Sequence, residues 1–144
     1  MAEGNHKPVT VTHLVRGGDL NHHDTLFAGE GALRMVECGF MEAASFLGTN
    51  EIVCLRIHGM LFAKPVHKGS MIQIKSKVIY AGKSSLGVYV RTELFPTEEF
   101  VVDGYLTFVH TDQSGKALPH NKTLHLEEYL VDLQKQYLTL KAAE

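Results

Sequence analysis

Three charged residues share one stripe of a long apolar segment, residues 26–47. Glu30, Arg34 and Glu37 follow one another at helical spacing, which places them on one face of a helix. A charge among apolar neighbours either reaches solvent or is costly to bury unless it is paired. The stripe is therefore either a solvated edge, on which Arg34 pairs with both glutamates, or part of a pocket. In a pocket, the Glu37 carboxylate would orient or deprotonate a water molecule. Glu42 lies on a different face, and we expect it to be structural.

The residues just before this segment offer further groups for such a site. Phe27, Ala28 and Gly29 stand at the start of the predicted helix, where unpaired backbone N–H groups and the helix dipole favour negative charge. A glycine lets a carbonyl group approach the backbone, so the Gly29 N–H is a candidate oxyanion donor. The amide of Asn21 can donate or accept a hydrogen bond. Taken alone, the Asn-His-His-Asp run at 21–24 is typical of a turn.

Two other chemistries are not supported by the sequence. His22 and His23 are adjacent in a predicted loop and have no third ligand at a recognisable spacing, so we expect no metal site. Cys38 and Cys54 each lie in an apolar run, where a free cysteine behaves as a small core residue. Neither has a recognisable histidine partner, so we expect no covalent nucleophile and no disulfide.

The elements that must position these groups follow from periodicity. Alternating or β-branched runs predict strands at 9–15, 51–61, 71–80, 86–94 and 99–110. The segments 26–47 and about 124–141 predict helices, and Asp24-Thr25 offers a cap for the first. One long helix beside a run of strands indicates an α+β fold, which we expect to form a single domain over residues 1–144. That helix is apolar almost all round, more than one sheet can cover, so we expect a second copy to complete the core.

Composition excludes several classes of function. Apolar residues make up 44% of the 144 residues, which is ordinary for a globular protein. The formal net charge of -2 comes without a basic patch, so we expect no nucleic-acid partner. No run is long and apolar enough for a membrane helix, and the first residues lack the apolar stretch of a signal peptide. We therefore expect a cytoplasmic protein.

Several segments resemble those of one family, in the same order. Residues 19–29, Asp-Leu-Asn-His-His-Asp-Thr-Leu-Phe-Ala-Gly, resemble the N-x-x-G-x-x-F-G-G motif that precedes a long helix in hot-dog acyl-CoA thioesterases. Residues 58–66 are similar to that family's D-x-x-D-F-x-x-P-V segment, and residues 81–86 to its G-[RK]-[ST]-S-x loop. The Thr-Phe-Val of residues 107–109 is similar to its T-F-V strand. The resemblance extends over roughly residues 14–119.

The resemblance implies a hot-dog fold, in which a five-stranded antiparallel sheet wraps a central helix. It also implies dimers that join two sheets, commonly assembled as a trimer of dimers, which is a hexamer. The implied reaction is hydrolysis of acyl-CoA to a fatty acid and CoA, with Asn21 from one subunit and a helix carboxylate from its neighbour. Lys83, Ser84 and Ser85 would contact the CoA phosphates. CoA enters as part of the substrate, and no separate cofactor is expected.

The sequence departs from the family pattern at three positions. Asp24 replaces the usual glycine, and Ala28 replaces the first glycine of the pair. The family's helix carboxylate aligns with Val36, whereas Glu37 lies one position further, a rotation of about 100° on a helix. We expect Glu37 to activate the water molecule, with Asp24 as the reserve candidate.

Two alternatives remain open at this point. The chain is either an enzyme of the implied kind or a non-catalytic acyl-CoA-binding protein that has lost the carboxylate at Val36. Within the same fold, a 3-hydroxyacyl dehydratase would use a histidine with a carboxylate, which His23 and Glu37 would supply. The acyl chain length and the pathway are not encoded in any of these motifs.

Overall fold

The computed structural model describes residues 7–143. Within this range it contains five strands and two α-helices, which confirms the predicted α+β class. The elements in chain order are β1 (Thr10–Leu14), η2 (Gly17–Asp19), α1 (Ala28–Leu47), β2 (Ile52–His58), β3 (Met71–Ala81), β4 (Ser85–Phe95), β5 (Phe100–His110), η3 (Glu128–Leu130) and α2 (Val131–Ala142).

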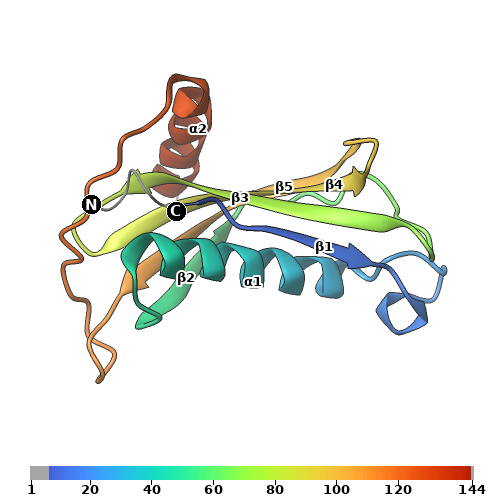
Figure 1. Ribbon diagram of the computed structural model, residues 1–144, viewed down its shortest axis with the longest axis horizontal. Coiled ribbons are helices and arrows are strands. Elements are labelled where there is room, and N and C mark those ends of the chain that lie inside the picture. Colours follow the sequence, from blue (N-terminus) through green and yellow to red (C-terminus); the bar gives the residue numbers. More distant parts are fainter. Residues whose placement is uncertain (1–6, 144) are drawn as a thin grey trace.

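The five strands form one sheet in the order β1-β3-β4-β5-β2, and every neighbouring pair is antiparallel. The central helix α1 runs along one face of this sheet, and α2 stands on the other face (Figure 1). This arrangement confirms the predicted hot-dog fold. Because β2 follows α1 but pairs with β5, it forms an outer edge of the sheet.

Helix α1 is held by a continuous apolar face. Met35, Cys38 and Ala43 are fully buried against the sheet. At Gly39 a Cβ atom would lie 2.4 Å from Leu106 Cδ1, so the glycine allows close packing of helix and strand. The helix ends at Gly48, whose φ of 74° is left-handed and whose N–H donates to the Ala44 carbonyl.

The start of α1 differs from the prediction. The helix begins at Ala28 with Phe27 at the N-cap position, two residues later than expected, and no side chain caps it. The predicted cap from Asp24-Thr25 is wrong, because the Thr25 hydroxyl hydrogen-bonds to the Asn21 side chain instead. The first N–H groups of α1 are left without a capping side chain.

Strand β3 also departs from the simple alternation in its sequence. A bulge between Val78 and Tyr80 inserts one residue opposite β4. Regular alternation would place Tyr80 on the same face as Ile72 and Ile74, but after the bulge it packs with Tyr137 of α2 on the opposite face.

The C-terminal helix is shorter than the predicted 124–141. Residues before 128 are not helical, and α2 itself starts at Val131. The apolar residues of this segment belong to two different hydrophobic clusters. Leu124 packs on the core between α1 and the sheet, and Leu126 packs in the cluster between α2 and the sheet. Tyr137 is fully buried against Gly87, so α2 covers the face of the sheet that α1 does not use.

One side of the protomer keeps apolar groups in solvent. Leu33 and Met41 are exposed on the outer stripe of α1. On the edge strand β2, Val53, Leu55 and Ile57 are each about half exposed (49%, 60% and 52%). Helix α2 lies on the other face and does not cover this side (Figure 1). In residues 7–143, no helix has the length and apolar character needed to cross a membrane.

Candidate active site

Asn21 is held in a fixed orientation at the start of its loop. Its Oδ1 accepts the backbone N–H groups of His23 (2.8 Å) and Thr25 (3.2 Å), and its Nδ2 donates to the Thr25 hydroxyl at 3.0 Å. Because backbone N–H groups engage Oδ1, the orientation of the amide is fixed, with Nδ2 directed towards the Thr25 hydroxyl. One of its two hydrogens remains for a further acceptor.

Asp24 occupies a left-handed backbone position, with φ of 63°. This conformation is accessible to glycine without strain and is adopted by Asp and Asn more readily than by most residues. The loop therefore keeps the geometry for which the family motif has glycine. Because aspartate stands in place of the motif's glycine, the loop carries an additional side chain here, and it is exposed. The Asp24 backbone N–H donates to the Asn21 carbonyl.

The start of α1 supplies free hydrogen-bond donors beside this loop. The first N–H to find an acceptor in the helical pattern is that of Gly31, which donates to Phe27 at 3.0 Å. Within residues 7–143 the N–H groups of Ala28 and Gly29 have no such acceptor. The Phe27 ring lies where a Gly29 side chain would be, 2.5 Å from a Cβ placed there. The Gly29 N–H is therefore a donor without a helical acceptor at the positive end of the α1 dipole, next to the Phe27 ring.

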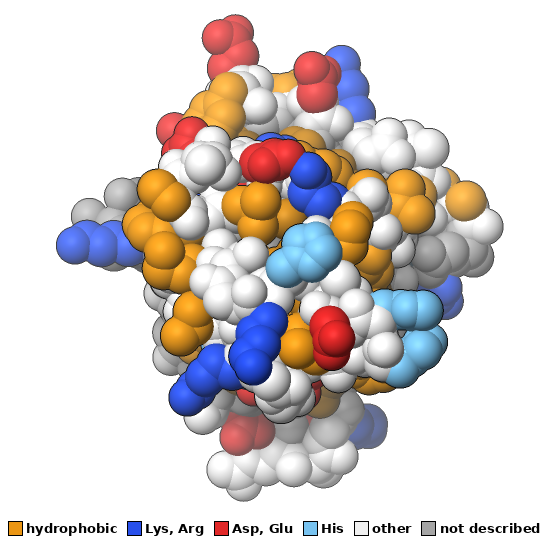
Figure 2. All heavy atoms as spheres, turned by 90° about the vertical axis from the view of Figure 1, so that its right-hand side faces the viewer, with side chains coloured by type: hydrophobic (Ala, Val, Ile, Leu, Met, Phe, Trp, Pro, Cys, Tyr) orange, Lys and Arg blue, Asp and Glu red, His pale blue; other side chains and the backbone are white. Residues whose placement is uncertain are grey.

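Asn21 and Ala28 line the same hollow, which has a volume of about 290 Å³. Most of the other lining side chains are apolar, and Lys64, which also lines it, pairs with Glu99. Figure 2 views this end of the molecule, where hydrophobic side chains lie between charged and histidine side chains. The remaining lining residues are Leu26, Phe62, Ala63, Pro65, Val66 and Val101.

In the charged stripe of α1, Arg34 pairs with Asp19 in place of the predicted Glu37. Arg34 lies 3.6 Å from Glu30 and 3.7 Å from Asp19, and no contact joins it to Glu37. The expected pairing with both glutamates is therefore wrong for Glu37. Asp19 is buried and accepts hydrogen bonds from the Arg16 backbone and from His13, and these bonds hold the pKa of Asp19 below its usual value. This cluster fixes the segment that leads to Asn21.

Glu37 is exposed on the outer stripe of α1. Eight residues separate it from Gly29, which is about 12 Å along the helix axis, so one protomer does not bring the two together. Val36, the preceding residue, is partly buried and packs against the core. The predicted catalytic set is thus split within one chain.

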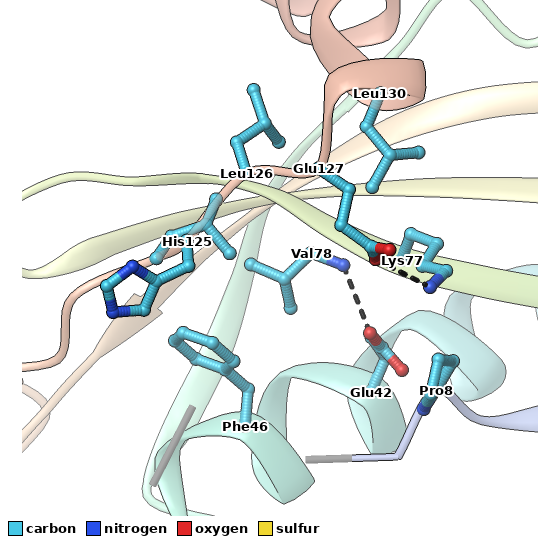
Figure 3. A pocket seen from close by; sticks show the side chains of 10 residues that line it. Pro8, Glu42, Phe46, Lys77, Val78, His125, Leu126, Glu127 and Leu130 are labelled. Carbon is cyan, nitrogen blue, oxygen red and sulfur yellow. Dashed lines mark hydrogen bonds and ion pairs between the residues drawn. The ribbon is translucent and has the colours of Figure 1, made fainter. Parts of the chain in front are cut away.

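The buried carboxylate of α1 is Glu42, and it serves a structural purpose as expected. It is 1% exposed and accepts the backbone N–H groups of Val9 (2.8 Å) and Val78 (3.0 Å). Figure 3 shows it at the base of a separate hollow, below an ion pair of Lys77 with Glu127. That hollow lies towards the C-terminal part of α1, away from Asn21.

The predicted CoA-binding loop lies at the far end of the sheet from Asn21. Lys83, Ser84 and Ser85 form the hairpin between β3 and β4, at the end where α1 terminates. The two ends are separated by the length of α1, about 30 Å. His120 anchors this hairpin: its Nδ1 accepts the Lys122 N–H, and its Nε2 donates to the Ser85 carbonyl. One protomer therefore brings Asn21 and Ala28, the first residue of α1, together at the hollow, but not the hairpin.

Comparison with known proteins gives this site its class. No protein-family model matches the sequence. An uncharacterized acyl-CoA thioester hydrolase of Bacillus subtilis (strain 168), YkhA, is 30% identical over 115 residues, which are 77% of this chain and 66% of that protein. The chain thus matches about two thirds of the length of its curated relative.

Solved structures agree with this relative. An acyl-CoA hydrolase from Staphylococcus aureus, in complex with butyryl coenzyme A, coenzyme A and coenzyme A disulfide, has a TM-score of 0.84 and 27% identity, covering 94% of this chain and 84% of that one. An apo-hexameric acyl-CoA thioesterase has a TM-score of 0.84 and 25% identity, covering 94% and 89%. The sheet order and the position of α1 define a protein of the hot-dog fold. The chain belongs to the family of acyl-CoA thioester hydrolases, which confirms the resemblance seen in its motifs.

Variants of the Staphylococcus aureus enzyme identify three side chains that were replaced by alanine in solved structures. They are an asparagine, an aspartate fifteen positions later, and a threonine a further seventeen positions on. Those variant structures have TM-scores from 0.83 to 0.85 with this chain.

Proposed function

We propose that this chain hydrolyses acyl-CoA thioesters at sites shared between two subunits. The observation that carries the proposal is the pairing of an oriented Asn21 amide with the uncapped N-terminus of α1, both lining one apolar hollow. A thioester carbonyl placed there would receive hydrogen bonds from the Asn21 Nδ2 and the Gly29 N–H. Such donors are strongest where the negative charge of the transition state develops.

The second subunit would bind along the edge strand β2. That strand is an edge of the sheet and exposes three apolar side chains, and Leu33 and Met41 are exposed on the outer stripe of α1. An antiparallel pairing of two β2 strands continues both sheets and buries both stripes. It also sets the start of one protomer's α1 against the middle and far end of its partner. The similar structures that are hexameric favour further assembly of such dimers into a trimer of dimers.

In this arrangement the partner subunit supplies the missing groups. Glu37 of the partner subunit would accept a proton from water as the water oxygen attacks the carbonyl carbon. Collapse of the tetrahedral intermediate breaks the carbon–sulfur bond, and the thiolate takes the proton back from the glutamic acid. The products are the free acid and CoA. The hairpin with Lys83, Ser84 and Ser85 would contact the CoA phosphates across the same interface.

The intervals between the variants of the Staphylococcus aureus enzyme support an inference about where this chain departs from that enzyme. Counted from Asn21, the same intervals reach Val36 and Val53. The amide is retained, but the carboxylate and hydroxyl positions both carry valine. Water activation therefore passes to Glu37, the nearest carboxylate on the exposed side of α1.

The same two valines favour a second candidate function. A chain that keeps the Asn21 amide and the apolar hollow but lacks the family's acid would bind acyl-CoA without turning it over. Thermal stabilisation by acyl-CoA without release of free thiol would support this binding function. The two functions differ only in whether Glu37 acts as the base.

Subunit complementation tests the proposed two-subunit site. Asn21→Ala and Glu37→Gln homo-oligomers should each be nearly inactive, because every site lacks one group. After the two variants are mixed and allowed to exchange subunits, each mixed dimer has one site with both groups intact. Turnover should rise to about one quarter of wild type, since half of the randomly formed dimers are mixed.

Two results of this experiment would count against the proposal. Full activity of Glu37→Gln would remove this residue from the mechanism. Failure of the mixture to regain activity, after subunit exchange is verified by native mass spectrometry, would place Asn21 and Glu37 in the same subunit's site or in none. Glu128→Gln, an exposed glutamate outside the interface, serves as the matched control.

A further inference from the structure

The hollow beside Asn21 has one wall that is formed by a partly exposed aromatic side chain. Leu26 is fixed because its N–H donates to the Val66 carbonyl at 2.7 Å, and Ala63 is fixed by its bond to the Val101 carbonyl at 3.3 Å. Between these two anchors stands Phe62, whose side chain is 37% exposed and has no polar contact to hold it. The ring is therefore the part of the lining that can set the depth of the hollow.

Gly31 makes room for this ring. A Cβ atom at position 31 would lie 3.1 Å from Phe62 Cε1 and 3.5 Å from Leu26 Cδ2. The ring thus rests against the bare backbone of Gly31, at the end of the first turn of α1. A methyl group at this position would push the ring towards the open part of the hollow, because the helix backbone cannot move away from the sheet.

We infer that this hollow takes the acyl chain and that Phe62, seated on Gly31, limits it to short chains. The inference rests on the proposed thioester hydrolysis, since the carbonyl held by Asn21 and Gly29 would direct its alkyl group between Leu26 and Phe62. The volume of about 290 Å³ is at the lower end for ligand pockets, and Asn21 and Lys64 already occupy its polar rim. A short alkyl group fills the apolar remainder, whereas a long one meets the ring.

Two substitutions with opposite effects test this assignment. Phe62→Ala removes this wall of the hollow, so kcat/KM for octanoyl-CoA relative to butyryl-CoA should rise by about tenfold or more. Gly31→Ala drives the ring inwards, so the same ratio should fall below that of the wild type. Rates of thiol release are measured for acetyl-, butyryl-, octanoyl- and palmitoyl-CoA. Phe62→Leu provides a milder variant with the same expected direction, in case Phe62→Ala does not fold.

A matched control separates the acyl pocket from a general loss of packing. Phe95→Ala removes a ring of similar exposure (41%) that lines a different hollow at the same end of the sheet. It should lower all rates in proportion or not at all and should leave the ranking of chain lengths unchanged. An unchanged ranking in both Phe62→Ala and Gly31→Ala would overturn the inference.

The experiment also distinguishes the acyl pocket from the proposed reaction. Dissociation constants of the same acyl-CoAs are measured by calorimetry for each variant. If no variant releases thiol but the preferred chain length still shifts in these constants, hydrolysis is rejected and the acyl pocket stands. If thiol is released and neither quantity shifts, the pocket is rejected and hydrolysis stands.

Discussion

The Asn21 amide donates to the Thr25 hydroxyl at 3.0 Å, and the Thr25 backbone N–H donates back to the Asn21 side-chain oxygen at 3.2 Å. This reciprocal pair closes the loop and fixes the amide without using both of its hydrogens. It explains why an asparagine, and not simply any polar residue, stands at this position.

Asn21→Asp tests the role of the remaining amide hydrogen. The change keeps the shape and the oxygen that accepts backbone N–H groups, but it removes the donor and adds a negative charge beside the expected oxyanion. Turnover should fall by about 10²-fold or more, since loss of one oxyanion donor has that effect in other hydrolases. Asn50→Asp, at an exposed position after α1, is the control and should retain wild-type kcat. Wild-type turnover in Asn21→Asp would rule out donation by this amide.

Val36→Asp in a Glu37→Gln background tests whether a carboxylate at position 36 can replace Glu37 in activating the water molecule. The double variant restores a carboxylate fifteen positions after Asn21, the interval found in the Staphylococcus aureus enzyme. It should regain turnover relative to Glu37→Gln by about 10²-fold, the usual contribution of a general base. Unfolding temperatures must be compared, because Val36 contacts the core. A folded double variant without recovery would contradict a water-activating role at this part of α1.

The His13–Asp19–Arg34 cluster predicts a pH dependence of stability. Because hydrogen bonds from Arg16 and His13 lower the pKa of Asp19 from 3.8, folding favours the ionised carboxylate. Its stabilising contribution is complete above pH 3.8 and is lost as the pH falls through the lower folded-state pKa. In Asp19→Asn, the free energy of unfolding should therefore decline less steeply below that pH. Denaturant unfolding at a series of acidic pH values measures the slope, and equal slopes would refute the prediction.

Glu42→Gln should weaken the fold without changing the chemistry. The amide would turn a donor towards one of the two backbone N–H groups, of Val9 and Val78, that the carboxylate now accepts. An unsatisfied buried donor costs roughly 1–3 kcal/mol, and the free energy of unfolding should fall by that amount. Glu51→Gln, an exposed change just before β2, is the control and should cost little. Equal stability of the two variants would show that the Glu42 charge is not needed.

The main elements could be predicted because their sequence patterns are local. The apolar run of α1 and the alternation in β3, β4 and β5 each require one periodicity, and the order of motifs then indicated the family. The limits of α2 could not be found this way. Leu124 and Leu126 fit a helical spacing, but each packs on a different cluster from an extended segment.

The sequence predicted candidate residues for the site but not the contacts that these residues make in the structure. Asn21 and Gly29 follow from a motif that is contiguous in sequence. The pairing of Arg34 with Asp19 joins residues on opposite sides of a loop, and helical spacing favoured Glu37 instead. Phe62 went unnoticed as a wall of the site, because its contact with Gly31 depends on how the segment after β2 folds back over α1. Its place in the motif at residues 58–66 was the one available signal.

The length of α1 limits where residues can be inserted into the chain. Its 20 residues set the distance between the Asn21 end and the hairpin end of each protomer. In the proposed two-fold pair, the length of α1 would therefore fix the geometry of both shared sites at once. Inserting a single turn would displace the two halves by about 5 Å in both sites together. We therefore expect an insertion within α1 to disrupt the proposed shared sites more than an insertion after α2 does.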